Sequence, residues 1–352
     1  MSPRFARRMV PLLAMLGLLV SVGSSEPARR VLLFDTLADP AKFGEQALGA
    51  GARPLLVVYE VYPGADPHAR EQGSIDIPSL LRHIERVSGG SPPEWGLLDF
   101  EDPFMEWAES GPGGERWTKA IGQMVDAIKA VKRAFPKTKW GFYQVPYVRY
   151  WIEGKSWADA SREVQDRAAL KYLSQWQPVI DQSDWLCPSL YCLYDPAASS
   201  SADGAKVRDA GRAWSRAQVE ISFRAAGTRP VIPIISPIWQ VNGNASVGAP
   251  VPIDQLRGDV IEPALRAGAG GFVIWTSFDH YINCAVSGKP ASPPQFDRSS
   301  FVKHYLDGVE PRDWSDPTVS ATLRARSGRV VLNAILAVRE SEQSLKSGSP
   351  SP

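Results

Sequence analysis

Two carboxylates stand at the end of one apolar run in this 352-residue sequence. The string WGLLDFED places Asp99 and Glu101 two positions apart, with Phe100 between them. Because side chains alternate between the two faces of a β-strand, a strand here would point both carboxylates to one side and Phe100 to the other. Two carboxyls this close in a partly dry site do not both ionise easily, so such a pair holds a proton near neutral pH.

A carboxyl that holds a proton can act as a general acid toward a glycosidic oxygen. The same residues could instead cap a helix that begins near Pro103 and Phe104. The spacing alone favours neither interpretation.

Aromatic side chains end several other apolar runs. Tyr143, Tyr191, Trp239 and Trp275 lie at or just beyond four successive runs. Aromatic rings contact the apolar faces of sugars, and their polar ends bind hydroxyls. A single ring of this kind is more often part of a core, but four at successive run ends favour a carbohydrate-binding groove.

Short apolar runs alternate with longer segments of helical periodicity along most of the chain. The runs span 31–34, 54–61, 95–100, 139–144, 185–190, 230–235 and 271–275, and the helical segments span 77–87, 114–135, 159–180, 206–225 and 253–267. Strands separated by helices run parallel, and seven or eight such units close most simply into a barrel. The sequence therefore predicts an α/β fold, a distorted (β/α) TIM-like barrel with a single catalytic domain and its active site at the carboxyl ends of the strands. An open doubly wound sheet is the alternative, but its Gly-rich phosphate loop is missing after the first run.

The two ends of the chain differ from the middle. Residues 1–25 carry three arginines, then an apolar stretch of about 14 residues and small residues, which predicts a signal peptide and not a membrane anchor. Residues 26–310 would form the barrel. Residues 311–352 would form a C-terminal appendage with a helix over 324–342 and a polar tail. We expect a secreted protein with no stable membrane insertion after cleavage.

The composition excludes or weakens several classes of function. The 39 basic and 38 acidic side chains form no long single-sign run, which makes nucleic acid an unlikely partner. The four histidines show no metal-ligand spacing, and no GxSxG elbow is present. We therefore expect no metal, no cofactor and no serine nucleophile.

Five segments together resemble the hyaluronidases, family 56 of the glycoside hydrolases. In order, they are LLDFED, KWGFYQVPY, WLCPSLY, TRPVIPIISPIWQ and VPIDQLRGDVIEPALRAGAGGFVIWTSFD, within residues 55–284. The resemblance implies a distorted (β/α) barrel that cleaves β-linked N-acetylhexosaminides with retention. The nucleophile would be the acetamido oxygen of the substrate itself.

The resemblance also implies catalytic roles for four residues. Glu101 would donate the proton and then act as a base toward water, and Asp99 would orient the acetamide and stabilise the positive charge of the cyclic intermediate. Tyr143 and Tyr191 match tyrosines that contact the acetamide and the sugar at the cleaved bond.

Three further aromatic residues match positions that bind substrate in the family. Trp275 matches the tryptophan that lines the sugar pocket. Tyr59 and Trp239 match two groove aromatics. The expected partner is hyaluronan, chondroitin or a related N-acetylated polysaccharide.

This chain departs from the family pattern in its charge. Asp102-Pro103-Phe104 stands where vertebrate hyaluronidases carry an arginine that could meet a substrate carboxylate. Arg149, Lys139 or Arg257 could supply positive charge instead.

Two alternatives remain open at this point. The first is a carbohydrate-binding barrel without catalysis, although a binding protein has no need of the acid. The second is a glycosidase with a carboxylate nucleophile, for which Asp195 and Asp279 are candidates.

Overall fold

The computed structural model describes residues 30–35, 44–59, 67–198, 201–240, 248–276, 278–287 and 298–347. The predicted signal peptide lies outside these residues and stays a prediction. In the part of the chain that is described, no helix is both long enough and apolar enough to cross a bilayer.

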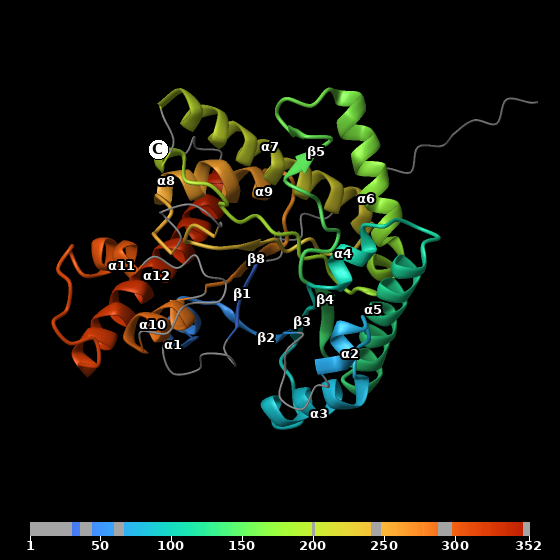
Figure 1. Cartoon of the computed structure of the whole chain (residues 1–352), viewed down its shortest axis with the longest axis horizontal. Coiled ribbons are helices and arrows are strands. Elements are labelled where there is room, and N and C mark those ends of the chain that lie inside the picture. Colours follow the sequence, from blue (N-terminus) through green and yellow to red (C-terminus); the bar gives the residue numbers. More distant parts are fainter. Residues whose placement is uncertain are drawn as a thin grey trace, which may run out of the picture.

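Six parallel strands form one sheet in the order β4-β3-β2-β1-β8-β7, at the centre of Figure 1. The middles of β2, β3 and β8 are buried, as expected for a parallel sheet that helices cover on its outside. The strands are β1 (Val31–Asp35), β2 (Arg53–Tyr59), β3 (Trp95–Asp99), β4 (Lys139–Phe142), β7 (Ile234–Ile235) and β8 (Gly271–Ile274).

The fifth apolar run, residues 185–190, lies between the two edge strands and joins them. Cys187 forms an isolated parallel bridge with Tyr143, just beyond β4, and Ser189 forms one with Ile234 of β7. Pro188 has no N–H to donate, so the run makes separate bridges and not a regular ladder. The strands therefore curl into a closed ring, which confirms the predicted distorted (β/α) barrel and excludes the open doubly wound sheet.

Helices form the outer layer of the barrel. One group, which includes α3 to α6, packs on the outside of β2, β3 and β4, and a second group, which includes α9 to α12, packs outside β1 and β8. The helices are α1 (Gly44–Gly49), α2 (Pro67–Glu71), α3 (Ile77–Ser88), α4 (Phe104–Ala108), α5 (Glu115–Ala134), α6 (Arg162–Gln182), α7 (Ser201–Ala226), α8 (Ile253–Gln255), α9 (Glu262–Arg266), α10 (Phe278–Ser287), α11 (Arg298–Tyr305) and α12 (Pro317–Ser347), with the short helices η1 (Pro196–Ala198) and η2 (Leu256–Ile261).

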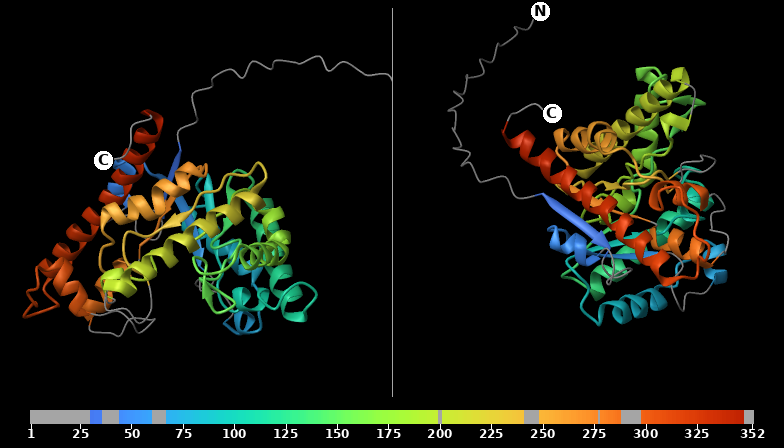
Figure 2. Two further views of the ribbon diagram at one scale, coloured as in Figure 1. Left: turned by 90° about the horizontal axis from the view of Figure 1, so that it is seen from above. Right: turned by 90° about the vertical axis from the view of Figure 1, so that its left-hand side faces the viewer.

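The longest helix, α12, lies within the segment expected to be an appendage. It runs along the outside of the barrel next to α1 and α10, drawn in red in Figure 2. Leu323, Val331 and Ile335 are buried in the same hydrophobic cluster as Phe272 of β8. Helix α12 therefore belongs to the outer layer that covers the sheet.

Two glycines make room for tryptophan rings between neighbouring strands. A Cβ atom on Gly96 would lie 2.5 Å from the ring of Trp140, and one on Gly141 would lie 2.9 Å from the ring of Trp185. Both tryptophans are fully buried. Because the packed interior has no space to move either ring aside, β3 and β4 need glycine at these positions.

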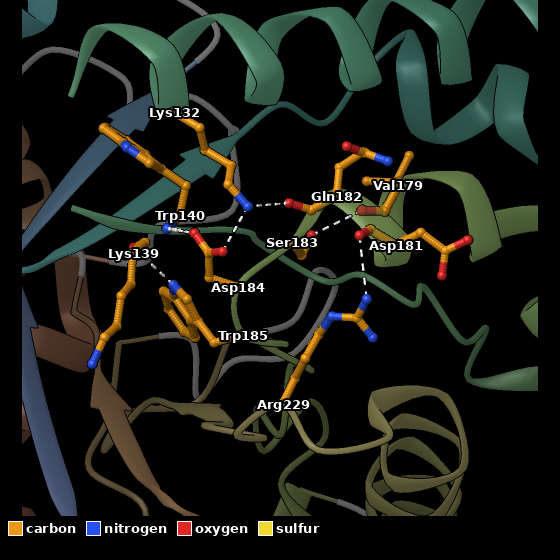
Figure 3. Close-up of polar contacts among 10 residues, drawn as sticks. All are labelled: Lys132, Lys139, Trp140, Val179, Asp181, Gln182, Ser183, Asp184, Trp185 and Arg229. Carbon is orange, nitrogen blue, oxygen red and sulfur yellow. Dashed lines mark hydrogen bonds and ion pairs between the residues drawn. The ribbon is translucent and has the colours of Figure 1, made fainter. Parts of the chain in front are cut away.

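Asp184 fixes the start of the fifth run against β4 (Figure 3). Its Oδ2 accepts a hydrogen bond from the backbone N–H of Trp140 at 3.0 Å, and its own N–H donates to the carbonyl of Trp140 at 2.8 Å. The Nζ of Lys132 lies 2.6 Å from Asp184 Oδ1 and also donates to the carbonyl of Gln182. The carboxylate thereby extends the β4 hydrogen-bond pattern to the run that ends near Tyr191.

We predict that Asp184→Ala destabilises the protein by about 2 kcal/mol, because the buried N–H of Trp140 loses its acceptor. Asp184→Asn keeps an acceptor oxygen and loses mainly the ion pair with Lys132, so it should cost less than about 1 kcal/mol. Urea unfolding of the two variants measures the difference. Equal stability of both variants and the parent protein would contradict this role for Asp184.

Candidate active site

Every second residue of the barrel strands faces the enclosed interior. The interior cluster holds Leu55 and Val57 of β2 and Trp95 and Leu97 of β3. The next residue in the β3 alternation is Asp99, whose Cα partner in β2 is Tyr59. The carboxyl ends of β2 and β3 therefore bring Tyr59 and Asp99 to the same level of the barrel.

The two predicted carboxylates follow this alternation. Asp99 is the last residue of β3 and is partly buried, and Glu101 follows two positions later and is exposed to solvent. Phe100 points the other way and is buried in the outer cluster with Phe104. Since the N-cap of α4 is Pro103, neither carboxylate occupies the cap position.

Four predicted aromatic residues form a continuous arc beside Asp99. The rings of Tyr143 and Tyr191 lie 6.1 Å apart, and Tyr191 stacks on Trp275 with centroids 5.5 Å apart and planes 21° apart. The Nε1 of Trp275 donates a hydrogen bond to the hydroxyl of Tyr59 at 3.2 Å. The arc therefore joins residues from β2, β4, the fifth run and β8 at the carboxyl end of the barrel.

Burial and the two carboxylates keep the inner tyrosines protonated. Burial raises the pKa of Tyr143 well above its ordinary value, and the charges of Glu101 and Asp99 raise it further, while Tyr191 and Ser189 offset part of this rise. Burial also raises the pKa of Tyr191, with smaller contributions from Tyr143 and Asp99. Both hydroxyls therefore remain neutral hydrogen-bond donors at neutral pH, beside groups that carry negative charge.

Gln144 is a neighbour of the site that the sequence patterns did not reveal. Its Nε2 donates a hydrogen bond to the hydroxyl of Tyr143 at 2.7 Å, and its backbone N–H donates to the carbonyl of Cys187 at 3.0 Å. Its φ of 55° lies in the left-handed region, which is unfavourable for a residue with a Cβ. A polar residue directly after a strand-end tyrosine is the only hint in the sequence, and it does not predict the direction of the amide.

The structure does not place Trp239 with the other predicted site residues. Its side chain is only 2% exposed and packs in the outer cluster that also contains Phe272 and Leu256. Its backbone N–H donates to the carbonyl of Ala249. A role for Trp239 in binding substrate stays a prediction, and the arc described above does not include it.

The alternative carboxylates have different surroundings. Asp195 accepts a hydrogen bond from the N–H of Ala197 at 2.9 Å, an arrangement typical of a helix cap, and it lies directly before η1. The side chain of Asp279 lies outside the described part of the structure. Within the described residues, no group of three or more His, Cys, Asp or Glu side chains could hold a metal ion.

Comparison with known proteins gives likeness of fold at low sequence identity. No protein-family model matches the chain, and no curated protein matches it. A crystal structure of bee venom hyaluronidase aligns with a TM-score of 0.49 and 15% identity, over 84% of this chain and 99% of that one. The same enzyme in complex with a hyaluronic acid tetramer gives 0.47 and 16%, over 71% and 91% of the two chains. A GH18 chitinase from Pseudoalteromonas aurantia gives 0.39 and 14%, over 74% and 77%. We therefore base the function on the site itself.

We predict that Gln144→Gly is more stable than Gln144→Ala by about 1 kcal/mol. Both variants lose the amide that binds Tyr143, but only glycine adopts the positive φ without a steric cost. Thermal unfolding of the pair isolates this backbone effect, because the lost hydrogen bond is common to both. The assignment is wrong if the alanine variant is at least as stable as the glycine variant.

Proposed function

We propose that this protein is an exported endo-β-N-acetylhexosaminidase of hyaluronidase type, which hydrolyses an N-acetylated polysaccharide with retention of configuration. The observation that carries the proposal is the pair Asp99 and Glu101 at the end of β3, beside the arc of Tyr59, Tyr143, Tyr191 and Trp275. Residues 1–25 would direct export and be removed.

In the first step, Glu101 donates its proton to the glycosidic oxygen as the bond from that oxygen to the anomeric carbon breaks. The carbonyl oxygen of the substrate's own acetamido group attacks the anomeric carbon from the opposite face. This neighbouring-group reaction needs one acid and one charge-stabilising group side by side. It does not need two carboxylates on opposite faces of the sugar, which is the usual arrangement of glycosidases. The end of β3 supplies such a pair.

In the second step, Glu101 acts as a base and takes a proton from water, which attacks the anomeric carbon and opens the cyclic intermediate. Two successive inversions leave the product with the configuration of the substrate. Asp99 lies deeper in the barrel, where its negative charge would stabilise the positive charge of the intermediate and accept the acetamide N–H.

The aromatic arc would hold the sugar in place. The neutral hydroxyls of Tyr143 and Tyr191 can donate hydrogen bonds to the acetamide and to the sugar at the cleaved bond. Trp275, stacked on Tyr191, provides an apolar wall, and Tyr59 extends that wall toward solvent.

Local charges favour a polymer with little negative charge. Arg149 forms an ion pair with Glu109, Lys139 lies 2.9 Å from Glu94, and Arg257 pairs with Glu340. Each of the three cations that could have met a substrate carboxylate is thus occupied by an acidic side chain. Hyaluronan and chondroitin remain candidates, as does an uncharged N-acetylated chain.

We predict that Glu101→Gln lowers turnover of a cleavable polysaccharide by about 10²- to 10⁴-fold, because the amide cannot donate a proton to the leaving oxygen. Asp99→Asn should lower turnover by roughly 10²-fold through the loss of charge stabilisation. The release of new reducing ends measures both.

Glu106→Gln is the matched control, since Glu106 is a solvent-exposed carboxylate on α4, five residues beyond Glu101. Its turnover and its unfolding transition should equal those of the parent protein. Undiminished turnover of Glu101→Gln, with the fold intact, would refute the proposed role of Glu101.

A further inference from the structure

A second group of aromatic residues lies outside the site described above, on the loops that follow Tyr143 and Tyr191. A short hairpin formed by β5 (Trp151–Ile152) and β6 (Lys155–Ser156) lies between α6 and α7, near the top of Figure 1. Trp151 on this hairpin is 51% exposed, and Tyr194 is 37% exposed. Among the described residues, Tyr59 is the only other Trp, Tyr or Phe that is exposed to this degree.

Tyr150 holds both exposed rings in place. Its ring meets Trp151 edge-on at a centroid distance of 5.2 Å and meets Tyr194 edge-on at 5.1 Å. Behind Tyr150 lies the buried ring of Trp214 from α7, at 5.5 Å. The exposed rings therefore rest on a packed aromatic base, and we call Tyr150, Trp151 and Tyr194 the aromatic platform.

The hairpin beneath the platform is anchored at several points. Trp214 Nε1 donates to the carbonyl of Val148 at 2.9 Å, and Trp157 Nε1 donates to the carbonyl of Arg149 at 2.9 Å. Ile152 is buried in the cluster between α6 and α7. A platform held this firmly loses little conformational entropy when a ligand covers it.

The platform is continuous with the candidate active site. Tyr194 follows Tyr191 by three residues, and Tyr150 follows Tyr143 by seven. Leu193 packs both against the interior cluster that holds Tyr143 and Tyr191 and against the hairpin cluster that includes Tyr150. A chain that leaves the arc on this side of the barrel reaches the platform next.

We propose that the aromatic platform is an additional binding site for the polysaccharide, where Trp151 and Tyr194 contact the apolar faces of sugar units beyond the cleavage site. The inference rests on the proposed function for the identity of the ligand. Exposed rings with one flat face in water suit the apolar face of a pyranose, and the hydroxyl of Tyr194 can bind sugar hydroxyls. The platform would select long chains over short ones.

The test measures binding by calorimetry in the Glu101→Gln background, so that no substrate is consumed. The probes are tetrasaccharides and octasaccharides of hyaluronan, chondroitin and chitin. Trp151→Ala should weaken binding of the preferred octasaccharide by about tenfold, which corresponds to about 1.4 kcal/mol, and leave tetrasaccharide binding unchanged. Trp151→Phe keeps a flat ring and should retain most of the affinity.

Leu336→Ala is the matched control, because Leu336 is an exposed apolar side chain on α12, in the outer helical layer. It should bind both lengths of oligosaccharide as the Glu101→Gln parent does. The proposal is overturned if Trp151→Ala binds every octasaccharide as tightly as that parent.

The outcomes separate this proposal from the proposed function. If the wild-type protein cleaves polysaccharide and Trp151→Ala changes nothing, only the platform is wrong. If no polysaccharide is cleaved but octasaccharide binding depends on Trp151, the platform stands and the catalytic function is wrong. If the protein neither binds nor cleaves any probe, both are wrong.

Discussion

The alternation of side chains along parallel strands in register is the constraint on which the candidate site depends. Since β2 and β3 pair Tyr59 with Asp99, the last inward residues of these strands lie at one level. Backbone hydrogen bonds from Tyr143 to Leu98 and from Gln144 to Cys187 bring β4 and the fifth run to that level as well. A shift of one residue in any strand would turn its site residue into the outer helical layer.

The lower part of the barrel preserves this register. Trp95, Trp140 and Trp185 begin or nearly begin three successive barrel segments, and the glycines beside them let the bulky rings fit. Asp184 then ties the fifth run to β4 where the two segments start. The site thus rests on packed tryptophans and on one carboxylate that binds backbone, far along the strands from the chemistry.

Much of the fold was predictable from the sequence, because long apolar runs and periodic helices depend on local residue order. Predictions for β1, β3 and α5 agree closely with the structure, as does the orientation of Phe100 away from Asp99. The fifth run and β7 are less regular than predicted because prolines such as Pro188 remove ladder donors. The positions of Trp239 and of the Gln144 amide depend on contacts between distant segments, and no spacing in the sequence encodes them. The β5–β6 hairpin, with strands of two residues, gives no periodic signal at all.

The central claim is that the inward layer at the barrel mouth hydrolyses a glycosidic bond next to an N-acetylated sugar. The most direct measurement is incubation of the purified wild-type protein with hyaluronan, chondroitin, heparosan and chitin oligomers, followed by product mass. We predict saturated oligosaccharides with an N-acetylhexosamine at the new reducing end from at least one polymer. Unsaturated products, which indicate a lyase, or no cleavage of any polymer would contradict the account.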